Sequence, residues 1–221
     1  RGLAEHLVLG MEREWSLDSE EAREKLQGIL DQADRMSHVV QHMRTFSREA
    51  GKPETRPVNV NEVLNSSLEL LGAQLRSRGV DVHQELTDPL PAVTANPFSL
   101  EEVFVNCLTN ARDAIEDRRA GQNANDEVFR VCLRTLPESE NGTDRVVVEI
   151  EDTGEGIASD KIDRVFDPFY TTKGPERGTG LGLSISKSIV DSFGGTIDLE
   201  SEPGQGTTVR IVLPTTGAEN D

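Results

Sequence analysis

The stretch that decides the fold runs from Asp152 to Gly182 and contains three motifs. They are Asp152-Thr-Gly-Glu-Gly-Ile157, Phe166-Asp-Pro-Phe-Tyr-Thr-Thr-Lys173 and Gly178-Thr-Gly-Leu-Gly-Leu183. Two glycine clusters therefore flank a polar loop that contains a proline. Glycine at alternate positions costs chain entropy and leaves backbone N–H groups unshielded. Such clusters usually occur where the backbone needs φ and ψ angles that other residues avoid, or where it closely approaches a ligand. We expect a ligand here, with phosphate as the first candidate, between a strand end and a helix start.

Composition limits the kinds of partner. The chain has 221 residues, enough for one core with an appendage or for two small domains, and carries a formal charge of −17. Nucleic acid is excluded as a partner because its binders need a basic surface. Cys107 and Cys132 fit neither a zinc spacing nor a disulfide framework, which is typical of a cytosolic protein. No apolar run reaches the roughly 20 residues of a membrane span, so we expect membrane attachment only through segments absent here.

Residues 1–50 are predicted to form a helical hairpin. Apolar residues of its second helix recur at alternating spacings of three and four, as in the seam of a helical bundle. A two-helix hairpin cannot bury both seams by itself, so we expect a homodimer that forms a four-helix bundle. Gly51-Lys-Pro-Glu-Thr-Arg-Pro57 cannot continue the helix and is predicted to be a linker.

Residues 58–216 are predicted to form a second domain, followed by a disordered tail at 217–221. Helices are expected after a cap at Asn59 or Asn61, from Asn96-Pro97 to about Arg119, and over 181–193. The expected strands cover 80–86, 128–135, 145–151, 196–201 and 207–213, with a polar loop at 137–144. The fold class is therefore α+β: an α/β sandwich in which three main helices pack on one face of a mixed sheet.

Five motifs in this domain resemble the catalytic region of sensor histidine kinases, within the wider family of ATPases that includes gyrase B and the Hsp90 chaperones. The motifs are an Asn box at 106–114, a first Gly box at 152–157, a Phe box at 166–169, a second Gly box at 178–183, and Gly204-Gln-Gly-Thr207. Each motif alone is weak, but five in the same order over about 100 residues leave little room for chance. The resemblance covers nearly the whole chain and implies the Bergerat fold and binding of Mg²⁺ and ATP.

The resemblance assigns roles to the first motifs. Asn106 and Asn110 lie four residues apart and project from one helix face, and Asn110 matches the family's Mg²⁺ ligand. Asp152 matches the carboxylate that accepts a hydrogen bond from the adenine amino group. The remaining residues expected on the adenine side are Gly154 and Gly156, which turn the backbone beneath the base, together with Ile157 and Thr207.

Residues 167–179 correspond to the family's ATP lid. Its cations Lys173 and Arg177 are expected to meet the phosphates, although for Arg177 a solvated surface charge is an equal alternative. The N–H groups at the following helix start are expected to bind phosphate oxygens, which adds Gly178, Thr179, Gly180, Leu181, Gly182 and Leu183 to the nucleotide-binding candidates. Phe166 and Phe169 are expected to anchor the lid by packing, with Phe169 counted among the nucleotide-binding residues.

Two departures from the family pattern bear on the chemistry. Asp113 stands where many relatives have a lysine, so neutralisation of the phosphates is expected to rely on Arg112 or on the lid. Hydrolysing relatives carry a glutamate base four residues before the Mg²⁺-binding asparagine, whereas this chain has Asn106, which cannot take a proton. We therefore expect phosphoryl transfer to a histidine, with Asn106, Asn110 and Lys173 as the catalytic candidates, rather than rapid hydrolysis. The alternatives are an ATP-hydrolysing relative and a degenerate dimerising scaffold.

The acceptor histidine is not evident in this chain. His6 lacks the acidic residue and the proline that follow the acceptor in the family, and Arg1-Gly-Leu-Ala-Glu resembles what comes about ten residues after it. We therefore expect the acceptor to lie before Arg1. His38 and His42 fall on the second helix of the hairpin and His83 in a strand. The resemblance further implies a response-regulator receiver domain as the partner that takes the phosphoryl group.

Overall fold

The computed structural model describes residues 54–121, 128–140, 143–173 and 178–216. The chain divides into two units between Pro53 and Glu54, and the described residues all belong to the second unit. The predicted hairpin 1–50 and tail 217–221 lie outside the described residues. Within these ranges, no helix combines the length and the apolar character that crossing a bilayer requires.

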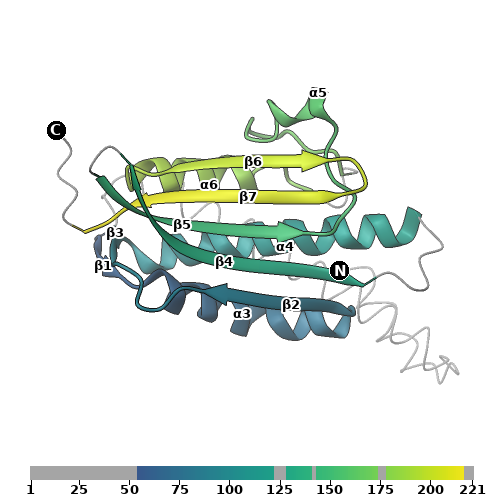
Figure 1. Cartoon of the computed structure of the whole chain (residues 1–221). Helices are drawn as coiled ribbons and strands as arrows, with labels where there is room; N and C mark the ends of the chain where they lie inside the picture. The colour runs from purple at the N-terminus through teal and green to yellow at the C-terminus, as the bar shows by residue number, and fades with distance from the viewer. Residues whose placement is uncertain (1–53, 122–127, 141–142, 174–177, 217–221) are drawn as a thin grey trace, which may run out of the picture. The chain divides into compact units, whose positions relative to one another are not determined.

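A five-stranded mixed sheet forms one layer of the unit (Figure 1). Its strands follow the order β2-β4-β5-β7-β6. β2 is parallel to β4, and every other neighbouring pair is antiparallel. The bounds are Val80–Leu86 for β2, Phe129–Glu140 for β4, Thr143–Asp152 for β5, Thr196–Glu202 for β6 and Gly206–Pro214 for β7.

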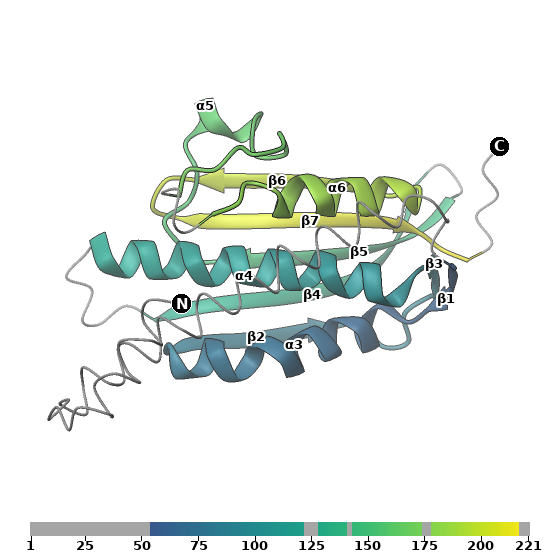
Figure 2. The ribbon, with the colours of Figure 1, turned by 180° about the vertical axis from the view of Figure 1, so that it is seen from behind.

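Three main helices cover one face of this sheet, as the two opposite views show (Figures 1 and 2). They are α3 (Val60–Ser77), α4 (Pro97–Gly121) and α6 (Gly182–Ser192), and α4 contacts both of the others. A short helix, α5 (Ser159–Ile162), lies in the segment between β5 and α6. The predicted fold class, a mixed sheet with three main helices on one face, is confirmed.

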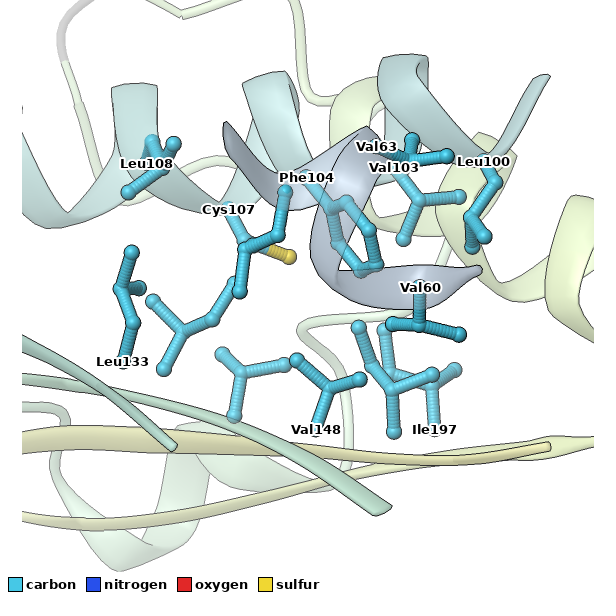
Figure 3. Close-up of a cluster of buried hydrophobic side chains, with 14 of the residues drawn as sticks. Val60, Val63, Leu100, Val103, Phe104, Cys107, Leu108, Leu133, Val148 and Ile197 are labelled. Atoms are coloured by element: carbon cyan, nitrogen blue, oxygen red, sulfur yellow. The ribbon is translucent and has the colours of Figure 1, made fainter. Parts of the chain in front are cut away.

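The core lies between the helices and the sheet because each element presents one apolar face. Along β5 and β7 alternate residues point to the helices, and the period-2 pattern leaves them 0–6% exposed. Phe104 of α4 is fully buried among them (Figure 3). Burial of one such side chain contributes about 1.5–3 kcal/mol, so these positions stabilise the contact between the two layers. The inward-facing strand residues are Val146, Val148, Ile150, Val209, Ile211 and Leu213.

Asparagine side chains begin two of the helices. Asn96 Oδ1 accepts a hydrogen bond from Ser99 N at 3.0 Å, directly before Pro97. For α3 the sequence left two caps open, and the structure selects Asn59, whose Oδ1 accepts from Asn61 N at 2.9 Å. The Asn61 side chain instead donates to Thr87 O at 2.8 Å and so ties α3 to the end of β2.

Two local predictions are corrected, and two short elements were missed. The predicted loop 137–144 is mostly strand, because β4 and β5 continue in register from Thr135 to Glu140, where Glu138 is opposite Arg145. Pro137 is tolerated there because β2 ends opposite Thr135, which leaves that part of β4 as an edge. The end of the predicted linker forms β1 (Arg56–Val58), which pairs with β3 (Val93–Ala95) in a two-stranded sheet. Strand β3 and helix α5 were not predicted, since both are too short to show periodicity.

Candidate functional site

The site is built along one face of α4. Asn106 is buried, and its Nδ2 donates to Gly182 O and to Ser186 Oγ, both at 3.4 Å. The amide therefore joins α4 to the first turns of α6. Asn110 follows one turn later and is half-buried. The expected projection of both side chains from one helix face agrees with their spacing on a continuous helix.

Asp152 is the last residue of β5 and is only 6% exposed. Its Oδ1 accepts a hydrogen bond from Gly154 N at 2.7 Å. Burial raises the pKa of Asp152 from the ordinary 3.8 to about 6, although the backbone N–H groups of Gly154 and Thr207 act in the opposite direction. A buried carboxylate that is ionised at neutral pH can accept a further hydrogen bond from a ligand donor.

The first Gly box turns tightly between α4 and the β6–β7 hairpin. Glu155 N donates to Ala114 O at 3.0 Å, and a Cβ on Gly154 would lie 2.6 Å from Ala114 Cβ. Gly156 has a φ of +72°, and a Cβ there would overlap Glu202 O. Side chains at these two positions would push the loop off α4 and off the hairpin. The glycines therefore serve the local fold directly.

Thr207 belongs to a hydroxyl cluster below this loop. Its Oγ1 lies 2.9 Å from Ser201 Oγ, which accepts from Ile157 N at 2.8 Å. Thr207 is paired with Asp152 across β5 and β7, and with Ser201 across β6 and β7. Ser201 was missed in the sequence; the signal was its place opposite Thr207 in the hairpin register.

The two phenylalanines of the Phe box behave differently. Phe166 packs against the core, and Lys187 Nζ lies 5.7 Å from its ring centroid. Phe169, by contrast, is 75% exposed with a φ of +67°. Its N–H donates to Gly180 O at 2.8 Å. The packing predicted for Phe166 is confirmed, whereas that predicted for Phe169 is wrong, because this backbone contact holds the residue in a conformation that leaves its ring in solvent.

Lys173 reaches α4. Its Nζ donates to Asp113 Oδ2 at 2.7 Å, while the Arg112 guanidinium donates to Asp113 Oδ1 at 2.7 and 3.0 Å. Arg112 also donates to Gln74 Oε1 of α3 at 3.0 Å. Burial raises the pKa of Asp113, but the two cations outweigh it and hold that pKa below its ordinary value. Arg177 lies outside the described residues.

The second Gly box leads directly into α6. Leu181 occupies the N-cap position, and Gly182 is the first helical residue. Leu181 N donates to Thr179 Oγ1 at 3.4 Å. A leucine side chain has no acceptor for the N–H groups of the first turn, which is the condition under which a helix start can receive a phosphate. Gly178, Gly180 and Leu183 are half-buried around this start.

The sequence motifs thus meet along α4. Asn106 contacts the second Gly box, Asp113 contacts the lid lysine, and Ala114 contacts the first Gly box. In the described ranges, no group of three or more His, Cys, Asp or Glu could hold a metal ion. Asn110 alone offers one amide oxygen, so a divalent cation held there would also need oxygens of a ligand.

Comparisons with known proteins agree with this arrangement. Residues 95–217 match the family described as histidine kinase-, DNA gyrase B-, and HSP90-like ATPase. Sensor histidine kinase ZraS of Escherichia coli (strain K12) is 35% identical over 197 residues, which are 88% of this chain and 38% of that protein. The chain thus spans less than half the length of this relative.

Two solved structures are also similar. One is the mycobacterial sensor histidine kinase MprB, with a TM-score of 0.58 and 26% identity over 73% of this chain and 98% of that one. The other is full-length ShkA in complex with AMPPNP, with a TM-score of 0.67 and 26% identity over 96% of this chain and 43% of that one. The chain belongs to the family of histidine kinase-, DNA gyrase B- and HSP90-like ATPases and is homologous to the catalytic region of sensor histidine kinases.

Proposed function

We propose that this chain binds Mg²⁺ and ATP along α4 as the catalytic region of a protein-histidine kinase. The observation that carries the proposal is that the lid lysine and both Gly boxes contact one face of α4, which carries the Asn box, next to the buried carboxylate of Asp152. The ATPase family match, and the AMPPNP complex of the similar protein ShkA, support an adenine nucleotide as the ligand.

On the adenine side, Asp152 accepts a hydrogen bond from the exocyclic amino group. Burial makes the ionised carboxylate costly, and a ligand N–H donor offsets that cost. Gly154 and Gly156 shape the loop below the base, with Ile157 beside them. Thr207 supports the contact, because its backbone N–H faces Asp152 and its hydroxyl is fixed by Ser201.

On the phosphate side, Asn110 holds Mg²⁺ together with phosphate oxygens. The bound Mg²⁺ neutralises charge on the phosphates. Lys173 supplies a side-chain cation, and Arg177 is a second candidate. The N–H groups at the start of α6 bind phosphate oxygens, which assigns this end of the nucleotide to Gly178, Thr179, Gly180, Leu181, Gly182 and Leu183. Phe169, exposed at the border of the lid, is the remaining candidate for nucleotide contact.

The reaction is transfer of the γ-phosphoryl group to a histidine. A ring nitrogen attacks phosphorus in line, the bond to the β-phosphate oxygen breaks, ADP leaves, and the imidazole releases a proton. Asn106 has no basic group with which to activate water, and its amide binds Gly182 O and Ser186. In the whole protein, we infer a cytoplasmic homodimer through the hairpin, and passage of the phosphoryl group to an aspartate of a response-regulator receiver domain.

Titration calorimetry with ADP and AMPPNP tests nucleotide binding. We expect Asp152→Asn to weaken both ligands at least about tenfold, because the amide presents a donor as well as an acceptor to the adenine amino group. Asp160→Asn, an exposed acid of α5, is the matched control. Unchanged affinity of the Asp152 variant would contradict the adenine assignment.

Labelling with γ-³²P-ATP tests the transfer step. If the acceptor precedes Arg1, residues 1–221 bind ATP without acquiring acid-labile phosphate. A label mapped to His6, His38 or His42 would refute that expectation. Rapid release of inorganic phosphate by this chain alone would instead favour the hydrolysing alternative.

A further inference from the structure

One charged cluster near the site has a geometry that the roles above do not explain. Asp113 accepts from two cations, one on each oxygen: Lys173 on Oδ2 and Arg112 on Oδ1. Gln74 of α3 accepts from the same guanidinium at 3.0 Å. The carboxylate is therefore fixed from its own helix and, through Arg112, from α3. A carboxylate held in this way has little freedom to move.

This ion pair is shielded from solvent. The side chains of Lys173 and Asp113 are 19% and 15% exposed, respectively, and their atoms are 2.7 Å apart. Exposed pairs contribute little because water and salt screen them, whereas a shielded pair with a charge-assisted hydrogen bond restrains both partners. Lys173 N–H also donates to Thr171 Oγ1 at 3.1 Å, a local bond that restrains the backbone of the lid next to the ion pair.

The place to which Lys173 is held is specific. Asp113 lies three residues after Asn110, on the same helix face, and immediately before Ala114, which contacts the first Gly box. The ammonium is therefore brought to α4 between the proposed Mg²⁺ ligand and the adenine-side loop. An ammonium has three donors, and one is directed to Asp113. Among the residues that the structure describes, the ammonium has no second acceptor, which leaves two donors for an anionic ligand.

We infer that Asp113 is a positioning residue, which anchors the lid lysine on α4 so that its ammonium meets the phosphates of ATP. The inference rests on the proposed function. Asp113 has two opposed effects on an anionic ligand: its own charge repels the phosphates, while its hold on Lys173 presents a cation to them. In the intact site the hold on Lys173 outweighs the repulsion.

A double-mutant cycle separates the two effects. We measure ATP affinity by titration calorimetry for the wild-type chain, Asp113→Asn, Lys173→Ala and the double variant. When Lys173 is absent, Asp113→Asn removes the repulsion without breaking the lysine anchor, and should tighten ATP binding. When Lys173 is present, the same change should weaken ATP binding roughly fivefold, within the range of coupling between contacting residues. If Asp113 only stabilised the fold, Asp113→Asn would change ATP affinity in the same direction with and without Lys173.

Control variants distinguish a failure of the Asp113 inference from a failure of the proposed function. Glu101→Gln removes one charge from α4 about 18 Å along the helix axis from Asp113, and should leave ATP affinity unchanged. Asp113→Glu keeps the anchor and should restore most of the wild-type affinity. If Asp113→Asn changes affinity by the same factor in both backgrounds, or tightens binding in both, the inference is overturned while nucleotide binding stands. If the wild-type chain binds neither ATP nor ADP, the proposed function fails, and this inference fails with it.

Discussion

Replacement of Asp152 by asparagine should make the nucleotide-free protein more stable. Burial raises the pKa of Asp152 to about 6, above the ordinary 3.8. The folded protein therefore holds the ionised form less favourably than the unfolded chain does, and asparagine removes this cost. The amide oxygen can still accept the hydrogen bond from Gly154 N. An aspartate that binds adenine would thus be kept although it lowers the free energy of unfolding, as is common at functional sites.

The magnitude follows from the two pKa values. Between pH 3.8 and about 6 the folded state binds more protons than the unfolded state, so ionisation of Asp152 lowers the unfolding free energy as pH rises. The loss is roughly 1.6 kcal/mol at pH 5, approaches about 3 kcal/mol at pH 7.5, and is constant above that. The asparagine variant avoids it. For a chain of this length, 3 kcal/mol corresponds to about 6–12 °C in Tm.

Urea unfolding of both proteins at pH 5, 6 and 7.5, without nucleotide, measures the difference directly. We expect the gain from Asp152→Asn to grow by about 1.4 kcal/mol from pH 5 to pH 7.5. Asp160→Asn, at an exposed position, controls for the loss of one negative charge. A gain that is the same at all three pH values, or a variant less stable than wild type at each of them, would refute the reasoning.

Three further predictions concern the two Gly boxes. Adenosine, which carries no phosphate, should bind about tenfold more weakly at pH 5 than at pH 7.5, because Asp152 becomes protonated below a pKa of about 6, and calorimetry should show no such dependence for Asp152→Asn. Gly156→Ala should cost about 2–4 kcal/mol in urea unfolding, since φ is +72° and the new Cβ would overlap Glu202 O. Gly182→Ala should change stability by less than about 1 kcal/mol, because its Cβ would lie 3.7 Å from Asn106 at the start of a helix. Equal losses of unfolding free energy at the two glycines would show that belonging to a glycine motif, and not the local geometry, determines whether alanine is tolerated.

Much of the fold could be predicted because its signals are local. The apolar face of α4 and its Asn96-Pro97 start are written within a few turns of one helix, and the alternation in β5 and β7 within a few residues. The pairing of β1 with β3 was missed, because Arg56 finds its partner Ala95 far along the chain. The length of the β4–β5 hairpin was likewise missed, since ion pairs from Arg210 to Glu138 and Glu149 bridge the strands there.

The candidate site likewise combines features set by the local sequence with features set by long-range contacts. The order of the motifs, with Asn110, Asp152 and the glycines in their places, is a property of the sequence alone, and it is enough to identify the family. Only the tertiary structure decided that Phe169 faces solvent, that Ser201 supports Thr207, and that Asp113 holds Lys173. The physical reason is that residue identity and spacing act within one element. The burial of a side chain, its pKa and its ion-pair partner depend on contacts between elements, here between α4, the lid and the ends of β5 and β7.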